Sequence, residues 1–449
     1  MRKHSLTRWA GVAMAAALVG SLAACAPTGN ATDDAASGGS AEEIAAALQK
    51  ESSITVWGWA PQLEPIVEAF EEKYPKIDVK LENVGTGNDQ YTKLQNAIKA
   101  GTGAPDVAQV EYYALPQFAL SGALADLTDF GAADLEDQFT ASTWGSVSLN
   151  DGIYALPQDS GPMAMFYRAD VFEGLGLEVP TTWDQYIEAG KVIHAANPDS
   201  YITNDVGDAG FTTSMIWQAG GQPYSVEDTT DVTVDFGDEG SRKWADNWNQ
   251  LVQNDLVAPI SSWSDEWYQG LTDGSIATLV IGAWMPGNLE SGVPDAAGKW
   301  RVAPMPTYEE GVPAAAENGG GGDAVLEQSE NKLVAYGFLE FLNGSEGAAI
   351  HAANGGFPST VADLESEEFL GYESDYFGGQ KINEVLVQAA KDVVPGWSYL
   401  PFQTYANSIY GDTVGQAYAA KSDINEGLAA WQDATVEYGI KQGFTVNGE

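Results

Sequence analysis

Cysteine and positive charge are scarce in this sequence of 449 residues. It holds a single cysteine, and 20 Lys and Arg stand against 64 Asp and Glu, which leaves a formal net charge of −44. One cysteine excludes a disulfide framework and a cysteine-rich zinc site. So few basic residues exclude the phosphate contacts of a nucleic-acid-binding protein and a polybasic patch for anionic lipid. We therefore expect no nucleic-acid partner.

Motifs for catalysis and cofactor binding are also missing. The sequence has no P-loop, no dinucleotide-binding glycine fingerprint and no EF-hand spacing. His194 and His351 lie in helix-like stretches without a surrounding motif, so a Ser-His-Asp or Cys-His arrangement has little support. We expect no catalytic residue, no cofactor and no metal site.

The N-terminus has the pattern of a secretory signal. Three basic residues precede an apolar run over 9–22, which is short for a membrane span of about 20 apolar residues. The run ends in Leu-Ala-Ala-Cys at 22–25, which resembles the lipobox of bacterial lipoproteins, where cleavage before the cysteine leaves it lipid-modified. The alternative is an ordinary secretory cleavage site with Cys25 nearby by chance. The lipobox interpretation predicts a signal peptide over 1–24 and a lipid anchor on the extracellular face of a bacterial membrane.

Small and polar residues follow the cysteine over 26–45, with Ser-Gly-Gly-Ser at 37–40. Such a composition is typical of a flexible linker. We therefore expect a lipidated Cys25 with a tether that together span 25–45, and a folded body that begins at residue 46.

The body of the chain has an α/β pattern. Its hydrophobic content of 44% is that of a globular protein, and the length suggests two or three domains at roughly 150 residues each. The residues at 54–57 and 105–110 predict short strands, alternating apolar residues predict a strand over 77–81, and helical spacing predicts helices over 63–70 and 91–98. Strands that alternate with helices favour mainly parallel sheets covered by helices.

Aromatic residues are abundant, with 14 Trp, 19 Tyr and 15 Phe. Several lie beside turn residues and polar side chains, at 57–59, 111–113, 282–286 and 395–399. A neutral sugar offers C–H faces that lie on aromatic rings and hydroxyls that donate and accept hydrogen bonds. Aromatic rings next to carboxylates and amides therefore predict a carbohydrate ligand.

The order and spacing of several short stretches resemble the family 1 extracellular solute-binding proteins, the maltose-binding-protein-like receptors of ABC sugar importers. The stretches that carry the resemblance lie at 54–59, 66–75, 100–107, 152–157, 166–168, 179–184, 220–221, 282–284 and 338–342.

The resemblance implies two α/β lobes with a ligand cleft between them, each lobe a mainly parallel sheet flanked by helices. It implies lobe 1 at 46–160 with 319–370 and lobe 2 at 161–318 with 371–449. It further implies a monomer that binds an oligosaccharide, which we expect to have two to four units, and then docks on ABC transporter permease subunits. No reaction is implied.

Site residues follow from the resemblance by position. Trp284 matches the family's stacking tryptophan, and Trp217 is expected either to line the cleft or to pack inside lobe 2. The other expected ligand contacts lie in the loop after the first strand, at the end of the third strand, at the two crossings and in a late aromatic stretch: Trp59, Glu111, Tyr112, Asp159, Asn318, Gly321, Asp323, Trp397, Tyr399 and Phe402.

Two other function classes remain open. A secreted glycoside hydrolase also needs aromatics and a carboxylate pair, and Glu111 with Asp159 would fill those roles if their carboxyls lay about 5–5.5 Å apart. A binding protein for a peptide, polyamine or metal is the second alternative. The absence of a His/Cys cluster disfavours a metal, and a polyamine requires more carboxylates in the cleft.

Overall fold

The computed structural model describes residues 38–227 and 230–448. The predicted signal peptide over 1–24 and Cys25 lie outside these residues. Within the described part of the chain, no helix is long and apolar enough to cross a membrane.

Residues 41–45, which we expected to belong to the tether, are helical. Ser40 and Glu43 form a capping box that begins helix α1, Ala41–Ala47. Ile44 and Leu48 are buried, and both approach Gly337 of helix α12, Lys332–Asn343. Residues 40–47 therefore belong to the folded body, because this stretch of small residues carries a helix-start signal and packs Ile44 against α12.

The first lobe, defined here by residues 38–156 and 321–353, is built on a five-stranded sheet in the order β2-β1-β3-β14-β6. β1 pairs in parallel with β2 and β3, whereas β14 runs antiparallel to both β3 and β6. Besides α1 and α12, its elements are β1 Ser52–Trp57, α2 Leu63–Lys73, β2 Ile77–Glu82, α3 Asn88–Ala100, β3 Val107–Glu111, α4 Leu115–Leu120, η1 Leu127–Phe130, η2 Ala132–Gln138, α5 Ala141–Val147, β4 Ser148–Leu149, β5 Gly152–Ile153, β6 Leu156–Pro157, β14 Gly321–Val325 and α13 Ser345–Ala353.

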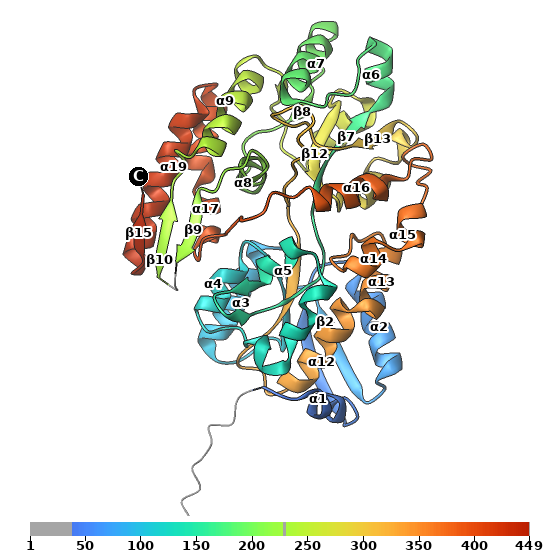
Figure 1. Cartoon of the computed structure of the whole chain (residues 1–449), viewed down its shortest axis with the longest axis vertical. Helices are drawn as coiled ribbons and strands as arrows, with labels where there is room; N and C mark the ends of the chain where they lie inside the picture. The colour runs from blue at the N-terminus through green and yellow to red at the C-terminus, as the bar shows by residue number, and fades with distance from the viewer. Residues whose placement is uncertain (1–37, 228–229, 449) are drawn as a thin grey trace, which may run out of the picture. The chain divides into compact units, whose positions relative to one another are not determined.

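The second lobe, residues 163–316 and 357–448, contains two buried apolar clusters on a three-stranded sheet in the order β12-β7-β13. Its elements are β7 Met163–Arg168, α6 Ala169–Leu175, α7 Trp183–Ala196, β8 Thr203–Asn204, α8 Ala209–Gln218, β9 Tyr224–Glu227, β10 Asp231–Val234, α9 Glu239–Gln253, β11 Val257–Ala258, α10 Asp265–Asp273, β12 Thr278–Gly282, α11 Met285–Gly292, η3 Pro294–Ala296, β13 Trp300–Ala303, α14 Val361–Leu364, α15 Glu367–Gly371, α16 Ile382–Lys391, α17 Gln403–Ser408, η4 Tyr410–Asp412, α18 Val414–Ala420, α19 Ile424–Gln442 and β15 Thr445–Asn447. Figure 1 shows this lobe above the first.

The three-stranded sheet β12-β7-β13 of the second lobe is antiparallel, which differs from the mainly parallel sheet that we expected there, whereas β8 pairs in parallel with β11 and β10 pairs in parallel with β15. β7 leaves the crossing at Met163, and β12 returns toward it and ends at Gly282, the partner of Met163. In the first lobe, β14 starts at Gly321, opposite the end of β3 at Glu111. The strands change direction because the chain leaves and re-enters each lobe at the same edge, and this brings their ends together at the crossing.

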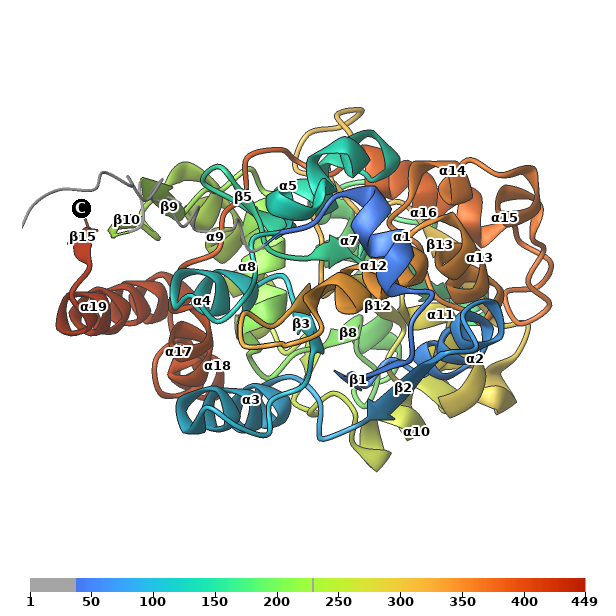
Figure 2. The same cartoon turned by 90° about the horizontal axis from the view of Figure 1, so that it is seen from below.

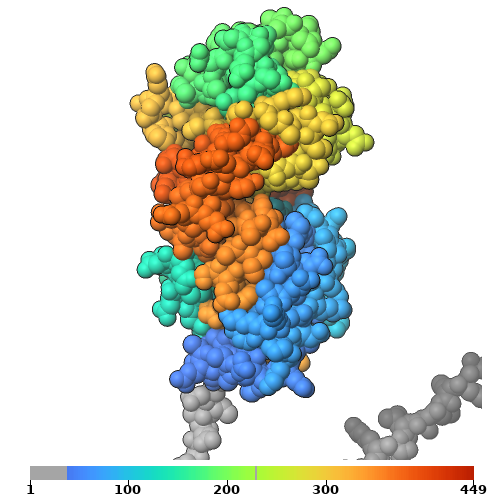
Figure 3. Space-filling view, turned by 90° about the vertical axis from the view of Figure 1, so that its right-hand side faces the viewer, coloured from blue at the N-terminus to red at the C-terminus, as the bar shows by residue number. Residues whose placement is uncertain are grey.

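The chain passes between the lobes along 157–162, 316–321 and 354–357, and these segments are hydrogen-bonded to one another. The third crossing lies earlier than the boundary expected at residue 370, because Phe357 and Leu364 pack in an apolar cluster of the second lobe. In Figure 3 the orange part of the chain runs from the blue surface of the first lobe to the yellow surface of the second.

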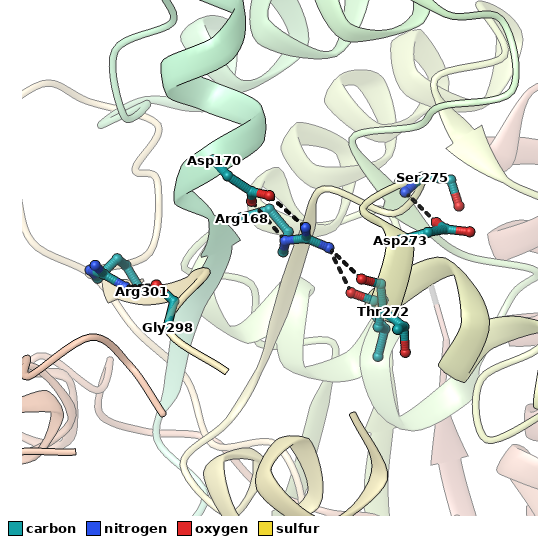
Figure 4. A network of polar contacts seen from close by, with 8 residues as sticks. Arg168, Asp170, Thr272, Asp273, Ser275, Gly298 and Arg301 are labelled. Atoms are coloured by element: carbon teal, nitrogen blue, oxygen red, sulfur yellow. Dashed lines mark hydrogen bonds and ion pairs between the residues drawn. The ribbon is translucent and has the colours of Figure 1, made fainter. Parts of the chain in front are cut away.

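A buried arginine holds the second lobe's sheet to α10. The Arg168 guanidinium forms an ion pair with Asp170 at 2.7 Å and donates to the carbonyl oxygens of Leu271 and Thr272 in the last turn of α10 (Figure 4). A cation is favourable at the C-terminus of a helix, and here it satisfies carbonyls that the helix itself leaves unpaired. The contact fixes α10 on the sheet.

Buried carboxyl groups gather at the crossings. Glu317 is 2% exposed and accepts hydrogen bonds from the hydroxyls of Ser142 and Ser160 and from the Gly161 amide at 2.7 Å. Asp323 is fully buried in β14. Burial raises the pKa of Asp323 to about 7 and that of Asp159 to about 6, and it also raises the pKa of Glu317.

These shifts predict that stability falls as the pH rises from about 4 to about 7. The folded chain keeps protons that the unfolded carboxyls release near pH 4, so the free energy of unfolding decreases with pH in this window. The thermal unfolding midpoint should be higher at pH 5 than at pH 8, and Asp323→Asn should flatten the slope. Glu68→Gln, an exposed charge change on α2, should leave the slope unchanged. A thermal midpoint that rises between pH 5 and pH 8 would contradict the raised pKa values of these buried carboxyls.

Candidate functional site

A cavity of about 660 Å³ opens between the lobes at the crossing. The first lobe lines it with the start of α3 and the end of β3. The second lobe contributes the loop and helix start at 203–214, the loop at 261–263, the end of β12 with Trp284, and α17 with η4. The return crossing at 318–320 completes it. Segments far apart in the sequence meet here because the strands of both lobes end at this edge.

Three tryptophans form an aromatic surface in the cavity. The Trp263 ring lies 5.8 Å from that of Trp284 with 31° between their planes, and 5.0 Å from that of Trp267. Trp263 is 49% exposed, and its φ of +69° is unusual for a residue with a side chain. Such backbone strain is retained mainly at functional sites. A large exposed ring held in this conformation therefore marks the surface as a candidate ligand platform.

Hydrogen bonds fix these rings. The Trp284 indole N–H donates to the Asn318 carbonyl at 2.7 Å, and the Trp267 indole N–H donates to Asn204 Oδ1 at 2.8 Å. Asn204 in turn donates to Ile260 and Ser262 of the loop that carries Trp263. The platform is therefore oriented before any ligand arrives, which lowers the entropy lost on binding.

Carboxylates face the aromatic surface from both lobes. Glu111 accepts the Tyr91 hydroxyl at 2.9 Å, and burial raises its pKa to about 7. In the second lobe, Asp208 caps α8 by accepting the Phe211 amide at 2.7 Å. Asp205 accepts the indole N–H of Trp248 at 2.8 Å, and burial raises the pKa of Asp205 to about 6.

Four of the residues predicted from the sequence line the cavity: Glu111, Trp284, Asn318 and Tyr399. Three others lie directly behind it and support the return crossing. The Tyr112 hydroxyl donates to the Asp159 carbonyl, and the Asp159 carboxylate accepts the Gly321 amide at 2.7 Å. Asp159 thus holds the backbone rather than lining the cavity, so the carboxylate pair of the hydrolase alternative does not face a common ligand space.

The remaining predicted residues are placed elsewhere. Trp59 packs edge-on against Tyr91 while its amide donates to Gln109, and Phe402 is buried against Tyr438 and Phe444. Asp323 faces the core of the first lobe, where it is fully buried. These residues were predicted from their type and their position in the family pattern, and neither reveals which face of a helix or strand a residue occupies.

Trp217 and Trp397 stack on each other, with ring centroids 5.1 Å apart and 6° between planes. Together they line a second cavity of about 510 Å³, not the one that holds Trp284. This cavity is bounded by α5, α14 and α16, which lie in the upper half of Figure 2, whereas α3, α10 and α17 of the first cavity lie in the lower half. The Trp217 indole also donates to the Val394 carbonyl, so its expected packing role in the second lobe fits the structure.

Sequence reasoning missed Trp263, Asp205, Asp208 and the amides of Asn204 and Asn407. Asp208 had a readable signal, since an aspartate followed by Ala-Gly-Phe at a helix start is typical of an N-cap. Trp263 had none beyond its turn-like neighbours, because its left-handed backbone depends on contacts with distant residues.

Comparisons with known proteins agree with this geometry. The family described as bacterial extracellular solute-binding protein matches residues 58–349. The lactose-binding protein of Rhizobium radiobacter is 28% identical over 349 residues, covering 73% of this chain and 80% of the relative. The arabinooligosaccharide-binding protein of Bacillus subtilis (strain 168) is 28% identical over 321 residues, covering 69% and 73%.

Two solved structures are similar over nearly the whole described body. An ABC transporter associated binding protein from B. animalis subsp. lactis Bl-04, in complex with β-1,6-galactobiose, has a TM-score of 0.80 at 45% identity, covering 88% of this chain and 99% of that one. The galacto-N-biose-/lacto-N-biose I-binding protein from Bifidobacterium longum, in complex with lacto-N-biose, has a TM-score of 0.78 at 26% identity, covering 88% and 98%.

Proposed function

Because this chain belongs to the bacterial extracellular solute-binding protein family, we propose that it binds an oligosaccharide in the interlobe cavity and delivers it to the permease subunits of an ABC importer. Proteins of this family bind ligands and are not enzymes. The observation that carries the proposal is the pre-oriented surface of Trp263 and Trp284 facing carboxylates and amides from both lobes.

The cavity has the chemistry that a sugar requires. Indole faces accommodate the C–H faces of pyranose rings, while Glu111, Asp208 and Asn407 offer acceptors and donors for hydroxyls. A volume of about 660 Å³ lies within the range of about 300–1,000 Å³ typical of small-ligand sites. The similar proteins described above are named for lactose, arabinooligosaccharides and galacto-N-biose/lacto-N-biose I, and one was solved in complex with β-1,6-galactobiose, which supports a ligand of two to four units.

Binding is coupled to the two-lobed architecture. A sugar that contacts Glu111 of the first lobe and Trp284 of the second gains both sets of contacts only when the lobes are close, so it shifts the population toward a closed conformation. We expect one or two aromatic stacks with several charge-assisted hydrogen bonds to give a binding free energy of about −8 kcal/mol, which corresponds to a micromolar Kd.

Truncation of the exposed platform should separate binding from folding. We expect Trp263→Ala to weaken saccharide binding at least tenfold, about 1.4 kcal/mol, because one stacking face is lost. The thermal midpoint of the ligand-free protein should change little, since the ring is 49% exposed and the substitution removes no hydrogen bond. Titration calorimetry with β-1,6-galactobiose measures the affinity.

The matched control is Tyr372→Ala, an aromatic truncation at a side chain that is 50% exposed and lies outside the cavity. It should leave the affinity unchanged. A Trp263→Ala variant that binds with normal affinity would remove this residue from the site.

We further propose that Cys25 is lipidated and tethers the monomer to the extracellular face of the membrane. The Leu-Ala-Ala-Cys sequence at 22–25 supports this, and the cysteine is unique in the chain. Cys25→Ala should move the protein from the membrane fraction to the medium and abolish incorporation of labelled fatty acid. The control variant Ser37→Ala should change neither the membrane location nor the fatty-acid incorporation. Membrane retention of Cys25→Ala would contradict the anchor.

A further inference from the structure

All the charged side chains that line the interlobe cavity carry negative charge. They are Glu111 from the first lobe and Asp205 and Asp208 from the second. Among the described residues that line this cavity, none is a lysine, arginine or histidine. The excess of negative charge in the cavity matches that of the whole chain, which carries a formal net charge of −44.

The partners of these carboxylates are neutral. Glu111 accepts the Tyr91 hydroxyl, Asp208 accepts a backbone amide at the start of α8, and Asp205 accepts the Trp248 indole N–H. Hydrogen bonds of this kind orient and stabilise a carboxylate but bring no side-chain cation to it. The raised pKa of Glu111 has the same physical origin, since a buried carboxyl without a nearby cation favours its neutral form.

We infer that this cavity selects saccharides by charge: it admits neutral sugars, favours sugars that carry an ammonium group and rejects sugars that carry a carboxylate, sulfate or phosphate. The inference rests on the proposed function and defines the ligand class more narrowly. An anionic sugar would bring like charge close to Glu111, which is partly buried at the end of β3, and to Asp208, which is exposed at the start of α8. An ammonium group would supply the cation that Glu111 and Asp208 lack.

Neutral sugars remain good ligands because a carboxylate accepts hydroxyl protons in short, charge-assisted bonds. Discrimination therefore comes from repulsion of the wrong ligand as much as from attraction of the right one. The two removable charges also lie on opposite lobes, at the end of β3 and at the start of α8. A charged group on the ligand would meet both when the lobes close.

The test compares three disaccharides by titration calorimetry on the detergent-solubilised full-length protein at pH 8. The probes are β-1,6-galactobiose, its 2-amino-2-deoxy analogue and its analogue with galacturonic acid at the non-reducing end. Spermidine is titrated in the same set as a control. We expect the amino analogue to bind at least threefold more tightly than galactobiose, and the uronic acid to bind at least tenfold more weakly.

Charge-removing variants of nearly unchanged shape separate repulsion from steric exclusion. Glu111→Gln keeps an acceptor for Tyr91, and Asp208→Asn keeps a helix cap of similar strength. In the double variant, the ratio between the affinities for galactobiose and for the uronic acid should fall at least threefold. Asp238→Asn, the equivalent change at the start of α9 and outside the cavity, should leave this ratio unchanged.

A uronic acid that binds within tenfold of galactobiose, or a ratio that the double variant does not lower, would overturn the charge inference while leaving saccharide binding intact. Failure of every neutral saccharide, together with tight binding of spermidine, would instead overturn the proposed function. The two failures are therefore distinguishable in one set of titrations.

Discussion

The site depends on the return crossing at 318–321, which contacts Trp284 of the second lobe and Tyr112 of the first. Its Asn318 carbonyl accepts the Trp284 indole, and the Gly320 carbonyl accepts the Tyr112 amide. Gly319 and Gly320 both have positive φ values, and a Cβ at Gly320 would lie 2.9 Å from the Tyr112 ring. Glycine is required there because the backbone must pass closely between an aromatic ring and the cavity. The platform of one lobe is thus held by the chain that enters the other.

This dependence explains why so much polar chemistry is buried at the crossing. Glu317, Asp159 and Asp323 are acidic groups in positions where apolar residues would be cheaper to bury. Glu317 and Asp159 accept backbone amides and hydroxyls from adjoining segments, so they specify how the crossings pair rather than adding net stability. A ligand in a cavity beside such a junction would contact both lobes at once.

Sequence reasoning succeeded where local signals decide structure. The strands near 54–57, 77–81 and 105–110, the helices near 63–70 and 91–98 and the place of Trp284 in the cavity wall could all be predicted from spacing or from family position. It failed where tertiary contacts decide. The direction of β12, the stacking of Trp217 on Trp397 and the left-handed turn at Trp263 depend on which segments meet at the crossing. The sequence can therefore identify an aromatic residue as turn-associated without revealing which cavity its ring faces.

The most direct test of this account is a calorimetric titration of the full-length protein with a panel of neutral saccharides of two to four units, with spermidine and a tripeptide as controls. The account predicts saturable binding of one molecule of at least one saccharide with micromolar affinity, and recovery of that saccharide unhydrolysed. Binding of spermidine or the tripeptide with no response to any saccharide would contradict it.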